Sequence, residues 1–192
     1  MYLSLLEIPF KAALDFPDRV SHRWHVKNGT ENRTYAETAR FIRVLTAGLA
    51  EAGVGRGDHV GFFVNNRHEW IATDFALMAL GAVSVPRGSD TTPKEVSFIF
   101  RHSDSRHLIL ESVEQLVALL PEMSAGDWER CATIFIVDAG GDADLPGFLR
   151  PRTVFYPDLV LRGEAALARE PGLVERLGDS IKGDDLLTIV YT

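Results

Sequence analysis

Residues 58–90 read DHVGFFVNNRHEWIATDFALMALGAVSVPRGSD, and this stretch decides the fold class. Its first apolar run, 59–64, is short and rich in Val and Phe, as in a buried strand. Residues 69–80 are almost all apolar helix formers, so the predicted helix has no wide polar face. Gly81 fits the position after a helix end, and 82–85 form a second strand-like run. Strand, buried helix and strand at this spacing predict a βαβ unit with parallel strands, and therefore an α/β protein.

Pro86 is expected to stop the second strand, and Trp70 is expected to be buried between the helix and the sheet. The residues on either side continue the alternation of strands and helices. Helical spacing and capping residues predict helices at 3–14, 34–52, 93–100, 113–120 and 164–169. Strand-like runs occur at 20–26, 33–35, 108–110, 132–137 and 186–190, with a hairpin turn at 27–32 and a loop at 138–146. This order predicts a mostly parallel sheet flanked by helices on both faces.

Composition and charge narrow the functional classes. The chain has 192 residues, 46% of them hydrophobic, which is enough for a substantial core. Its net charge of −7 argues against nucleic acid or an anionic membrane as a partner, since both select for basic surface. The single cysteine excludes an internal disulfide and a cysteine-based zinc site. No apolar run reaches the ~18 residues of a membrane span, and the first residues lack a signal-peptide pattern, so we expect a soluble, cytoplasmic protein.

Short motifs give no convincing catalytic group. The three glycines of 53–57 precede a strand instead of following one, and Asp58 stands where a dinucleotide fingerprint needs its third glycine. The sequence contains neither G-x-x-x-x-G-K-[ST] nor G-x-S-x-G, so a Walker loop and a hydrolase elbow are both excluded. The histidines within 22–25 and 102–107 lack the further ligands of a metal site. We therefore expect no catalytic residue and no metal ligand in this chain.

An ordered series of short motifs carries more information than any one of them. The pieces are PDRV (17–20), RTYAE (33–37), GLAEAGVGRGDHV (48–60), NRHEW (66–70), LGAVSVP (80–86) and DDLLTIVYT (184–192). In this order they resemble the N-terminal part of the AMP-forming acyl-CoA synthetases, within the adenylate-forming superfamily. The resemblance covers roughly residues 17–192, and 87–90 together with Glu69 and Trp70 are most similar to the long-chain fatty-acid branch.

That resemblance implies a two-step ligase reaction. ATP and a carboxylic acid give an acyl-adenylate and pyrophosphate, and the CoA sulfur then displaces AMP, with magnesium assisting. Thr192 matches the start of the family's ATP phosphate loop, and Gly88 and Ser89 match a region near the approach of CoA. The competing interpretation of Gly88 and Ser89 is a turn that leads into the helix at 93–100. The rest of the phosphate loop, the later nucleotide-binding motifs and the C-terminal catalytic lysine have no counterpart in this sequence.

Two functional hypotheses follow for residues 1–192. The first is the N-terminal α/β lobe of a long-chain fatty-acid CoA ligase, ending before the phosphate loop, inactive alone and binding none of ATP, CoA or magnesium by itself. The second is a free-standing, non-catalytic module that binds a nucleotide or a protein. Under the first hypothesis a fatty acid is the substrate of the whole enzyme. The incomplete lobe should then expose apolar surface and self-associate.

Overall fold

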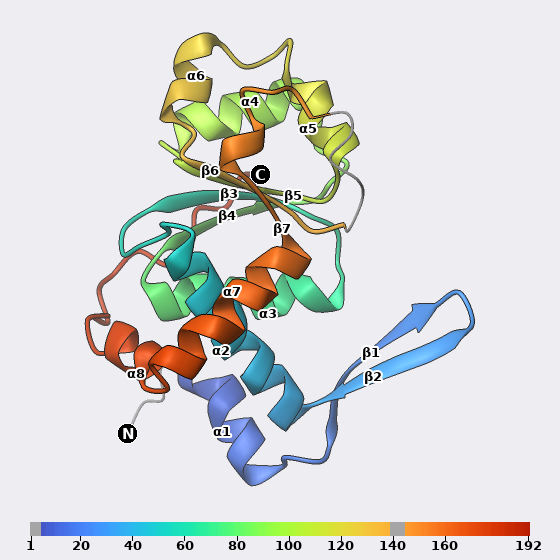
Figure 1. The fold of residues 1–192 in the computed structure, drawn as a ribbon, viewed down its shortest axis with the longest axis vertical. Coiled ribbons are helices and arrows are strands. Elements are labelled where there is room, and N and C mark those ends of the chain that lie inside the picture. Colours follow the sequence, from blue (N-terminus) through green and yellow to red (C-terminus); the bar gives the residue numbers. More distant parts are fainter. Residues whose placement is uncertain (1–4, 139–144) are drawn as a thin grey trace.

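A five-stranded parallel sheet forms the centre of the molecule (Figure 1). The structure is a computed structural model that describes residues 5–138 and 145–192. The strands lie in the order β4-β3-β5-β6-β7, and every neighbouring pair is parallel. Because the chain passes from β3 outward to β4 and then back across β3 to β5, its winding direction reverses between β3 and β5. The strands are β3 (His59–Phe63), β4 (Val83–Arg87), β5 (His107–Leu110), β6 (Thr133–Ile136) and β7 (Thr153–Phe155).

Helices cover both faces of this sheet, as the sequence predicted. Helices α4, α5 and α6 lie on one face, and α2, α3 and α7 lie on the other, with α1 and α8 packed outside that layer (Figure 1). The helices are α1 (Glu7–Asp15), α2 (Tyr35–Glu51), α3 (His68–Leu80), α4 (Pro93–His102), α5 (Val113–Leu119), α6 (Ala125–Arg130), α7 (Tyr156–Arg169) and α8 (Leu173–Gly178), with a 3-10 turn at Arg150–Arg152. None of the helices in the described part of the chain has the length and hydrophobicity of a membrane span.

The strands send alternate side chains into two separate hydrophobic cores. Phe62, Ile109 and Phe135 belong to the core that α2, α3 and α7 close. Phe63 and Leu110, on the same strands, belong to the core that α4 and α5 close. All five side chains are fully buried. A sheet covered on both faces therefore needs apolar residues at successive positions, which is why its strands appear in the sequence as continuous apolar runs.

Helix α3 has no exposed residue, which confirms that it is buried on most sides. Gly81 ends the helix in the left-handed conformation, with φ of 66°, as predicted. Trp70 is only half-buried, so the prediction that it is enclosed is wrong. It lies in the first turn of α3, near the edge of the sheet, and stacks on Phe62 with ring centroids 5.4 Å apart.

Reciprocal capping sets the starts of α2 and α4. The Thr34 hydroxyl accepts a hydrogen bond from the Glu37 N–H at 3.2 Å, and the Glu37 carboxylate accepts one from the Thr34 N–H at 2.7 Å. Thr92 and Glu95 form the same arrangement at α4, where Pro93 is the first helical residue. Helix α4 begins at the predicted residue 93, and α2 begins one residue after the predicted 34, because Thr34 caps the helix instead of starting it.

Strand β4 continues through Pro86 to Arg87, so the prediction that Pro86 stops it is wrong. The Ser84 N–H points away from β3 and donates to Leu187 O at 3.1 Å. Two residues later Pro86 faces the same outer side, and there its missing N–H removes no hydrogen bond to β3. Proline is thus accommodated because β4 is the outer strand.

The same proline explains why the predicted strand at 186–190 is absent. In that segment only Thr188 bridges to β4, opposite Ser84, and Ile189 N–H donates to Ser84 O at 2.9 Å. The next parallel hydrogen bond would need an N–H from Pro86, which proline does not have. The segment therefore follows β4 without forming a ladder.

Other elements were predicted with wrong limits or not at all. The first pair of strands, β1 (Val20–Val26) and β2 (Gly29–Thr34), is antiparallel, and β2 is longer than the predicted 33–35. Helix α7 begins well before 164, and α6, α8 and β7 were not predicted. These three have six, six and three residues, too short for a periodic pattern. Residues 3 and 4 of the predicted helix at 3–14, and 139–144 of the loop at 138–146, lie outside the described residues.

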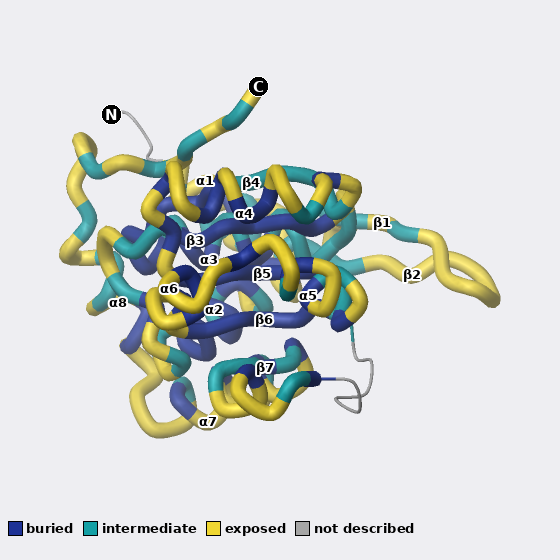
Figure 2. Tube along the Cα trace, turned by 90° about the horizontal axis from the view of Figure 1, so that it is seen from above, coloured by how far each residue is buried: buried dark blue, intermediate teal, exposed yellow. Residues whose placement is uncertain are grey.

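The β1–β2 hairpin projects away from the rest of the molecule (Figure 1). Most of its residues are exposed, whereas β3, β5 and β6 are buried along their length (Figure 2). Trp24 is one of its half-buried residues and stacks on His68 of α3, with ring centroids 4.0 Å apart. The base of the hairpin is therefore attached to the domain through an aromatic contact.

Two glycines allow α2 and α7 to approach closely. A methyl group added at Gly163 would lie 2.0 Å from Val44 O, and one added at Gly48 would lie 2.4 Å from Leu159 O. Both neighbours are backbone atoms, which cannot move as a flexible side chain can. The packing of these two helices therefore requires a residue without a side chain at both positions.

Candidate functional site

A hollow of 360 Å³ lies at the carboxyl ends of β3 and β4. In open α/β sheets, ligands bind beyond the carboxyl ends of the strands, next to the point where the winding direction reverses. The hollow lies on that side of the sheet, beside the reversal between β3 and β5. We therefore take this carboxyl edge as the candidate functional site. The hollow is lined by Val64, Asn65, Asn66, Trp70, Pro86, Arg87 and Gly88.

The predicted site residues Gly88 and Ser89 follow directly after β4. Gly88 O accepts hydrogen bonds from the Thr91 N–H at 3.2 Å and the Thr91 hydroxyl at 2.7 Å, so this segment is a turn that leads into α4. Ser89 O accepts a hydrogen bond from the Gln115 side chain of α5 at 3.5 Å. Gly88 lines the hollow as well as forming the turn. Its ligand role, like those of Ser89 and Thr192, stays a prediction.

The residues just before Thr192 are held against this edge by side chains. The Arg87 guanidinium donates to Tyr191 O at 3.0 Å, beyond the point where the backbone pairing with β4 stops. The Tyr191 hydroxyl lies 2.7 Å from His102 Nδ1 at the end of α4. The structure thus brings the neighbourhood of Thr192 next to Arg87, which also lines the hollow.

A network of charged side chains lies beside the hollow. The Arg67 guanidinium donates to Glu69 at 2.8 Å and to Asp138 at 2.6 Å, and it lies 3.5 Å from Glu111. Glu111 also accepts a hydrogen bond from the Asn65 N–H at 3.1 Å. Arg67 precedes α3, Glu111 follows β5, and Asp138 follows β6. One guanidinium therefore ties together the loops that leave three of the strands.

Burial and these hydrogen bonds shift the pKa values of the network in opposite directions. For Arg67, burial lowers the pKa, but its hydrogen bonds to Glu69 and Asp138 outweigh burial and raise it above the ordinary value. For Glu69, burial raises the pKa, but the hydrogen bond from Arg67 and the nearby His68 bring it below its ordinary 4.5. Burial lowers the pKa of His68. Near neutral pH the network consequently contains a charged arginine, a charged Glu69 and a neutral histidine.

Arg67, Glu111 and Asp138 were not identified as site residues from the sequence. Their positions in the sequence could have identified them, because each follows within a few residues of the carboxyl end of a strand in the parallel sheet. Such residues converge at the carboxyl edge. The sequence gives no spacing that relates Arg67 to Asp138, which lie far apart along the chain.

The donor set of this edge does not suit a triphosphate. Its side chains include carboxylates, amides and two guanidinium groups, of which Arg67 is bound to acidic partners and Arg87 donates to Tyr191 O. A phosphate site needs free cations or converging backbone N–H groups. In residues 5–138 and 145–192, no three His, Cys, Asp or Glu side chains are grouped as metal ligands. The residues described do not by themselves fit ATP and magnesium.

Comparison of the sequence with models of protein families assigns the chain to one family. The model of the family described as AMP-binding enzyme matches residues 10–192, almost the whole chain. The chain belongs to the AMP-binding enzyme family. This confirms the resemblance seen in the ordered motifs, and it identifies the parallel sheet with helices on both faces as the N-terminal fold of the adenylate-forming enzymes.

Curated relatives in the AMP-binding enzyme family include long-chain fatty-acid ligases. The chain is 34% identical over 103 residues to the long-chain-fatty-acid–CoA ligase FadD15 of Mycobacterium tuberculosis, which is 54% of this chain and 17% of the relative. It is 29% identical over 164 residues to the peroxisomal long chain acyl-CoA synthetase 7 of Arabidopsis thaliana, which is 83% of this chain and 21% of the relative. The chain thus spans about a fifth of the length of these relatives.

Solved structures of AMP-binding enzymes superpose on nearly all of the chain. Coronafacic acid ligase from Pectobacterium brasiliense has a TM-score of 0.74 at 21% identity, over 98% of this chain and 33% of that one. The Mycobacterium tuberculosis fatty acyl CoA synthetase has a TM-score of 0.61 at 25% identity, over 97% of this chain and 32% of that one. The fold is therefore shared with about a third of each enzyme.

Proposed function

We propose that residues 1–192 form the N-terminal α/β lobe of an AMP-forming ligase that activates long-chain fatty acids. The observation that carries this proposal is the family match over 10–192, in a chain that superposes on a fatty acyl CoA synthetase over 97% of its length. Relatives named as long-chain fatty-acid ligases support the substrate class. The whole enzyme would use ATP, CoA and magnesium, forming an acyl-adenylate and pyrophosphate before CoA displaces AMP.

In this proposal the carboxyl edge holds the start of the nucleotide site. Thr192 begins the loop that binds the ATP phosphates, and Gly88 and Ser89 lie near the approach of CoA. The position of Gly88 in the hollow and the hydrogen bond from Arg87 to Tyr191 O support this placement. Arg87 would then position the backbone that enters the phosphate loop.

We propose further that residues 1–192 do not activate an acid on their own. The physical reason is the donor set described above, in which Arg67 is engaged by carboxylates. Among the residues that the structure describes, this leaves Arg87, which also donates to Tyr191 O, as the one guanidinium in the lining of the hollow. Pyrophosphate exchange with ATP and palmitate is expected to stay at the level of the protein-free blank. A full-length fatty acyl CoA synthetase serves as the positive control in the same assay. Exchange that depends on both palmitate and this chain would refute the proposal.

A second candidate function is a non-catalytic module that binds another protein. The observation that favours it is a set of exposed apolar side chains on and beside the C-terminal segment. Phe98, Leu186 and Val190 are 53%, 54% and 65% exposed. Leu186 and Val190 belong to the segment that bridges to the outer side of β4, where the edge strand is only partly paired, and Phe98 lies on α4 with its ring centroid 6.4 Å from that of Tyr191.

These exposed residues also predict that the chain associates with itself. We expect dimers or larger species at micromolar concentration, because apolar side chains beside an open sheet edge favour contact with a second copy. Light scattering coupled to size exclusion measures the mass directly. Val190→Lys, which places a charge on that edge, should shift the distribution toward the monomer. A monodisperse monomer for the unmodified chain would contradict this expectation.

A further inference from the structure

Arg33 is held between aromatic rings at the base of the β1–β2 hairpin. Its guanidinium carbon lies 4.1 Å from the centroid of the Phe41 ring on α2 and 5.6 Å from that of the Trp24 ring on β1. Trp24 in turn stacks on His68 of α3, with an interplanar angle of 16°. Four elements therefore fix this guanidinium in place, and cation–π contacts of this kind favour a planar group lying over a ring.

The hydrogen-bonding capacity of Arg33 is unused. Within residues 5–138 and 145–192 its guanidinium makes no hydrogen bond and no ion pair, although such a group carries five N–H donors. Its side chain is half-buried, and burial lowers the pKa of Arg33, an effect that Glu69 and Glu37 partly offset at longer range. Arg23, on the same hairpin, instead donates to Asn32 at 2.9 Å. A partly desolvated cation with free donors is the arrangement expected of an anion-binding group.

A cavity of 410 Å³ lies against this guanidinium. One part of its wall is apolar, formed by Trp24 and Phe41 together with Val44 and Val160. The charged residues of its wall, besides Arg33, are Glu31, Glu37, Arg40 and Glu164.

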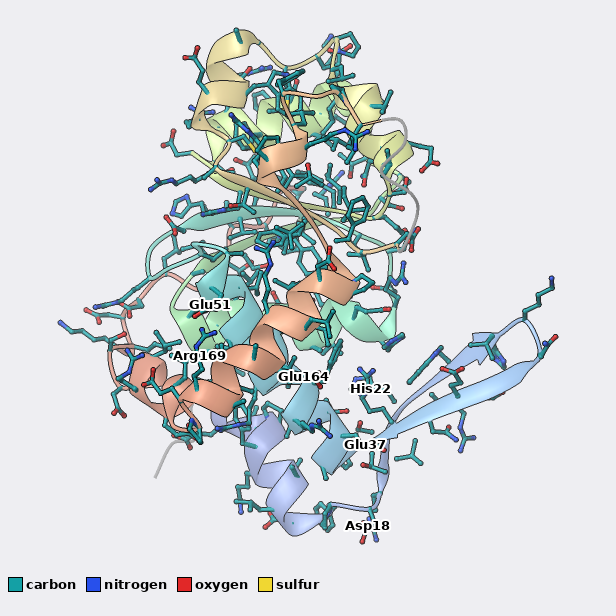
Figure 3. All side chains as sticks on the ribbon, viewed as in Figure 1. Asp18, His22, Glu37, Glu51, Glu164 and Arg169 are labelled. Atoms are coloured by element: carbon teal, nitrogen blue, oxygen red, sulfur yellow. The ribbon has the colours of Figure 1, made fainter. Side chains whose placement is uncertain are left out.

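Two of the acidic residues in that wall already have partners. Glu37 caps α2, and Glu164 pairs with Arg40 at 3.5 Å. Figure 3 shows Glu37 and Glu164 near the base of the hairpin, on α2 and α7. Arg40 is largely exposed to water and makes one contact of 3.5 Å with Glu164, whereas the Arg33 guanidinium is held between aromatic rings with its N–H donors free of partners in the described part of the chain.

The charges around the cavity select the kind of anion. Three carboxylates, from Glu31, Glu37 and Glu164, face two guanidinium groups, so an anion in the cavity meets net repulsion, which is smaller for a monoanion than for a dianion and must be outweighed by direct hydrogen bonds from Arg33. A single carboxylate matches the two parallel N–H groups of one guanidinium, and an apolar body matches the aromatic wall. We propose that this cavity is a binding site for an apolar monocarboxylate, whose carboxylate binds Arg33 and whose body packs on Trp24 and Phe41. The site is separate from the carboxyl edge and does not depend on the function proposed above.

The three tryptophans of the chain make a direct binding test possible. Trp24 lines the cavity, whereas Trp70 and Trp128 lie outside it and serve as internal references. The indole N–H signals of ¹⁵N-labelled protein are recorded during titration with 3-phenylpropanoate, and Trp24→Phe assigns the signal of Trp24. We expect a saturable shift of the Trp24 signal alone. Equal amounts of 3-phenylpropanamide and of inorganic phosphate should leave it unchanged, because the amide lacks the charge and phosphate lacks the apolar body.

Matched variants test whether Arg33 is responsible. Arg33→Gln is expected to weaken binding about tenfold or more, the usual loss for a charge-assisted hydrogen-bonded pair. Arg33→Lys keeps the charge but lacks the two parallel N–H donors, so its affinity should lie between those of the unmodified chain and of Arg33→Gln. Arg23→Gln removes a cation from the same hairpin outside the cavity and should bind as the unmodified chain does. The dispersion of the remaining signals shows whether each variant is folded.

The outcomes separate the possible sources of the carboxylate. N-acetyl-Phe-Glu-amide presents the same group as part of a polypeptide, and binding of this peptide without binding of 3-phenylpropanoate would overturn the assignment to a small acid. An equal shift with the amide, unchanged binding in Arg33→Gln, or no shift of Trp24 at millimolar acid would each overturn the proposal. None of these readouts depends on ligase activity, so they remain informative if the pyrophosphate exchange assay contradicts the proposed function.

Discussion

Replacing Gly163 by alanine is expected to lower the free energy of unfolding by about 3 kcal/mol, at the upper end of the usual cost of overpacking. The added methyl group would lie 2.0 Å from Val44 O and 2.9 Å from the Val44 carbonyl carbon, both in the backbone of α2. Helices α2 and α7 would have to move apart, which would loosen the packing of Leu45 and Leu159 in the core below. Thermal unfolding followed by circular dichroism should show a melting temperature roughly 10 °C lower.

Gly126 provides the matched control for this substitution. It also lies in a helix, but the nearest atom to an added methyl group is Ser124 Oγ at 3.9 Å, an ordinary contact distance. Alanine is a better helix former than glycine by about 1 kcal/mol, so Gly126→Ala should be neutral or stabilising. An unchanged melting temperature for Gly163→Ala would mean that the contact between α2 and α7 is looser than the structure describes.

Replacing Arg67 by methionine is expected to destabilise the chain by about 2–4 kcal/mol at pH 7. Methionine keeps much of the aliphatic length, so the substitution mainly removes charge and hydrogen bonds. It leaves Glu69 and Asp138 without the donors that lie 2.8 and 2.6 Å away, and Glu69 is largely buried from water. Urea unfolding at pH 7 measures the loss. Arg176→Met, which breaks an exposed ion pair with Glu170, should change stability little.

The effect of Arg67→Met should depend on pH. In the unmodified chain the pKa of Glu69 is below its ordinary 4.5, so its charged form stabilises the fold above that value. This contribution is lost as the pH falls through the lower pKa of the folded state. The variant lacks the contribution at neutral pH, and the two chains should therefore converge below pH 4.5. A difference of the same size at pH 7 and in acid would show that Arg67 acts through packing and not through charge.

The unit at 58–90 was predictable because several local signals agree there. Apolar runs, a mostly apolar helix and Gly81 at its end each support the same interpretation, and the structure confirms β3, α3 and β4 in that order. The C-terminal limit of β4 was harder to predict from the sequence. Whether Pro86 ends a strand depends on which side of that strand is paired, and the local sequence does not contain that information. The segment at 186–190 has the residue types of a strand, yet the partner it meets is this proline.

The two sites differ in what the sequence revealed about them. Gly88 and Ser89 were found through a motif, and they lie on the carboxyl edge beside the hollow. The cavity at Arg33 was missed because its wall combines residues from β1, β2, α2 and α7, with Val160 far along the chain from Trp24. In the sequence, Arg33 stands out only as the first residue of the family motif RTYAE (33–37). No sequence rule identifies an arginine whose donors will remain unused once the chain has folded.

The two hydrophobic cores share a single layer of backbone. If α4, α5 and α6 detached, Phe63 and Leu110 would become exposed to water, whereas Phe62 and Ile109 on the other face would stay buried. The sheet would then lose much of the apolar burial that stabilises it. The core under α2, α3 and α7 would be lost together with the core under α4, α5 and α6. Neither layer of helices can therefore melt independently, and the domain should unfold as one cooperative unit.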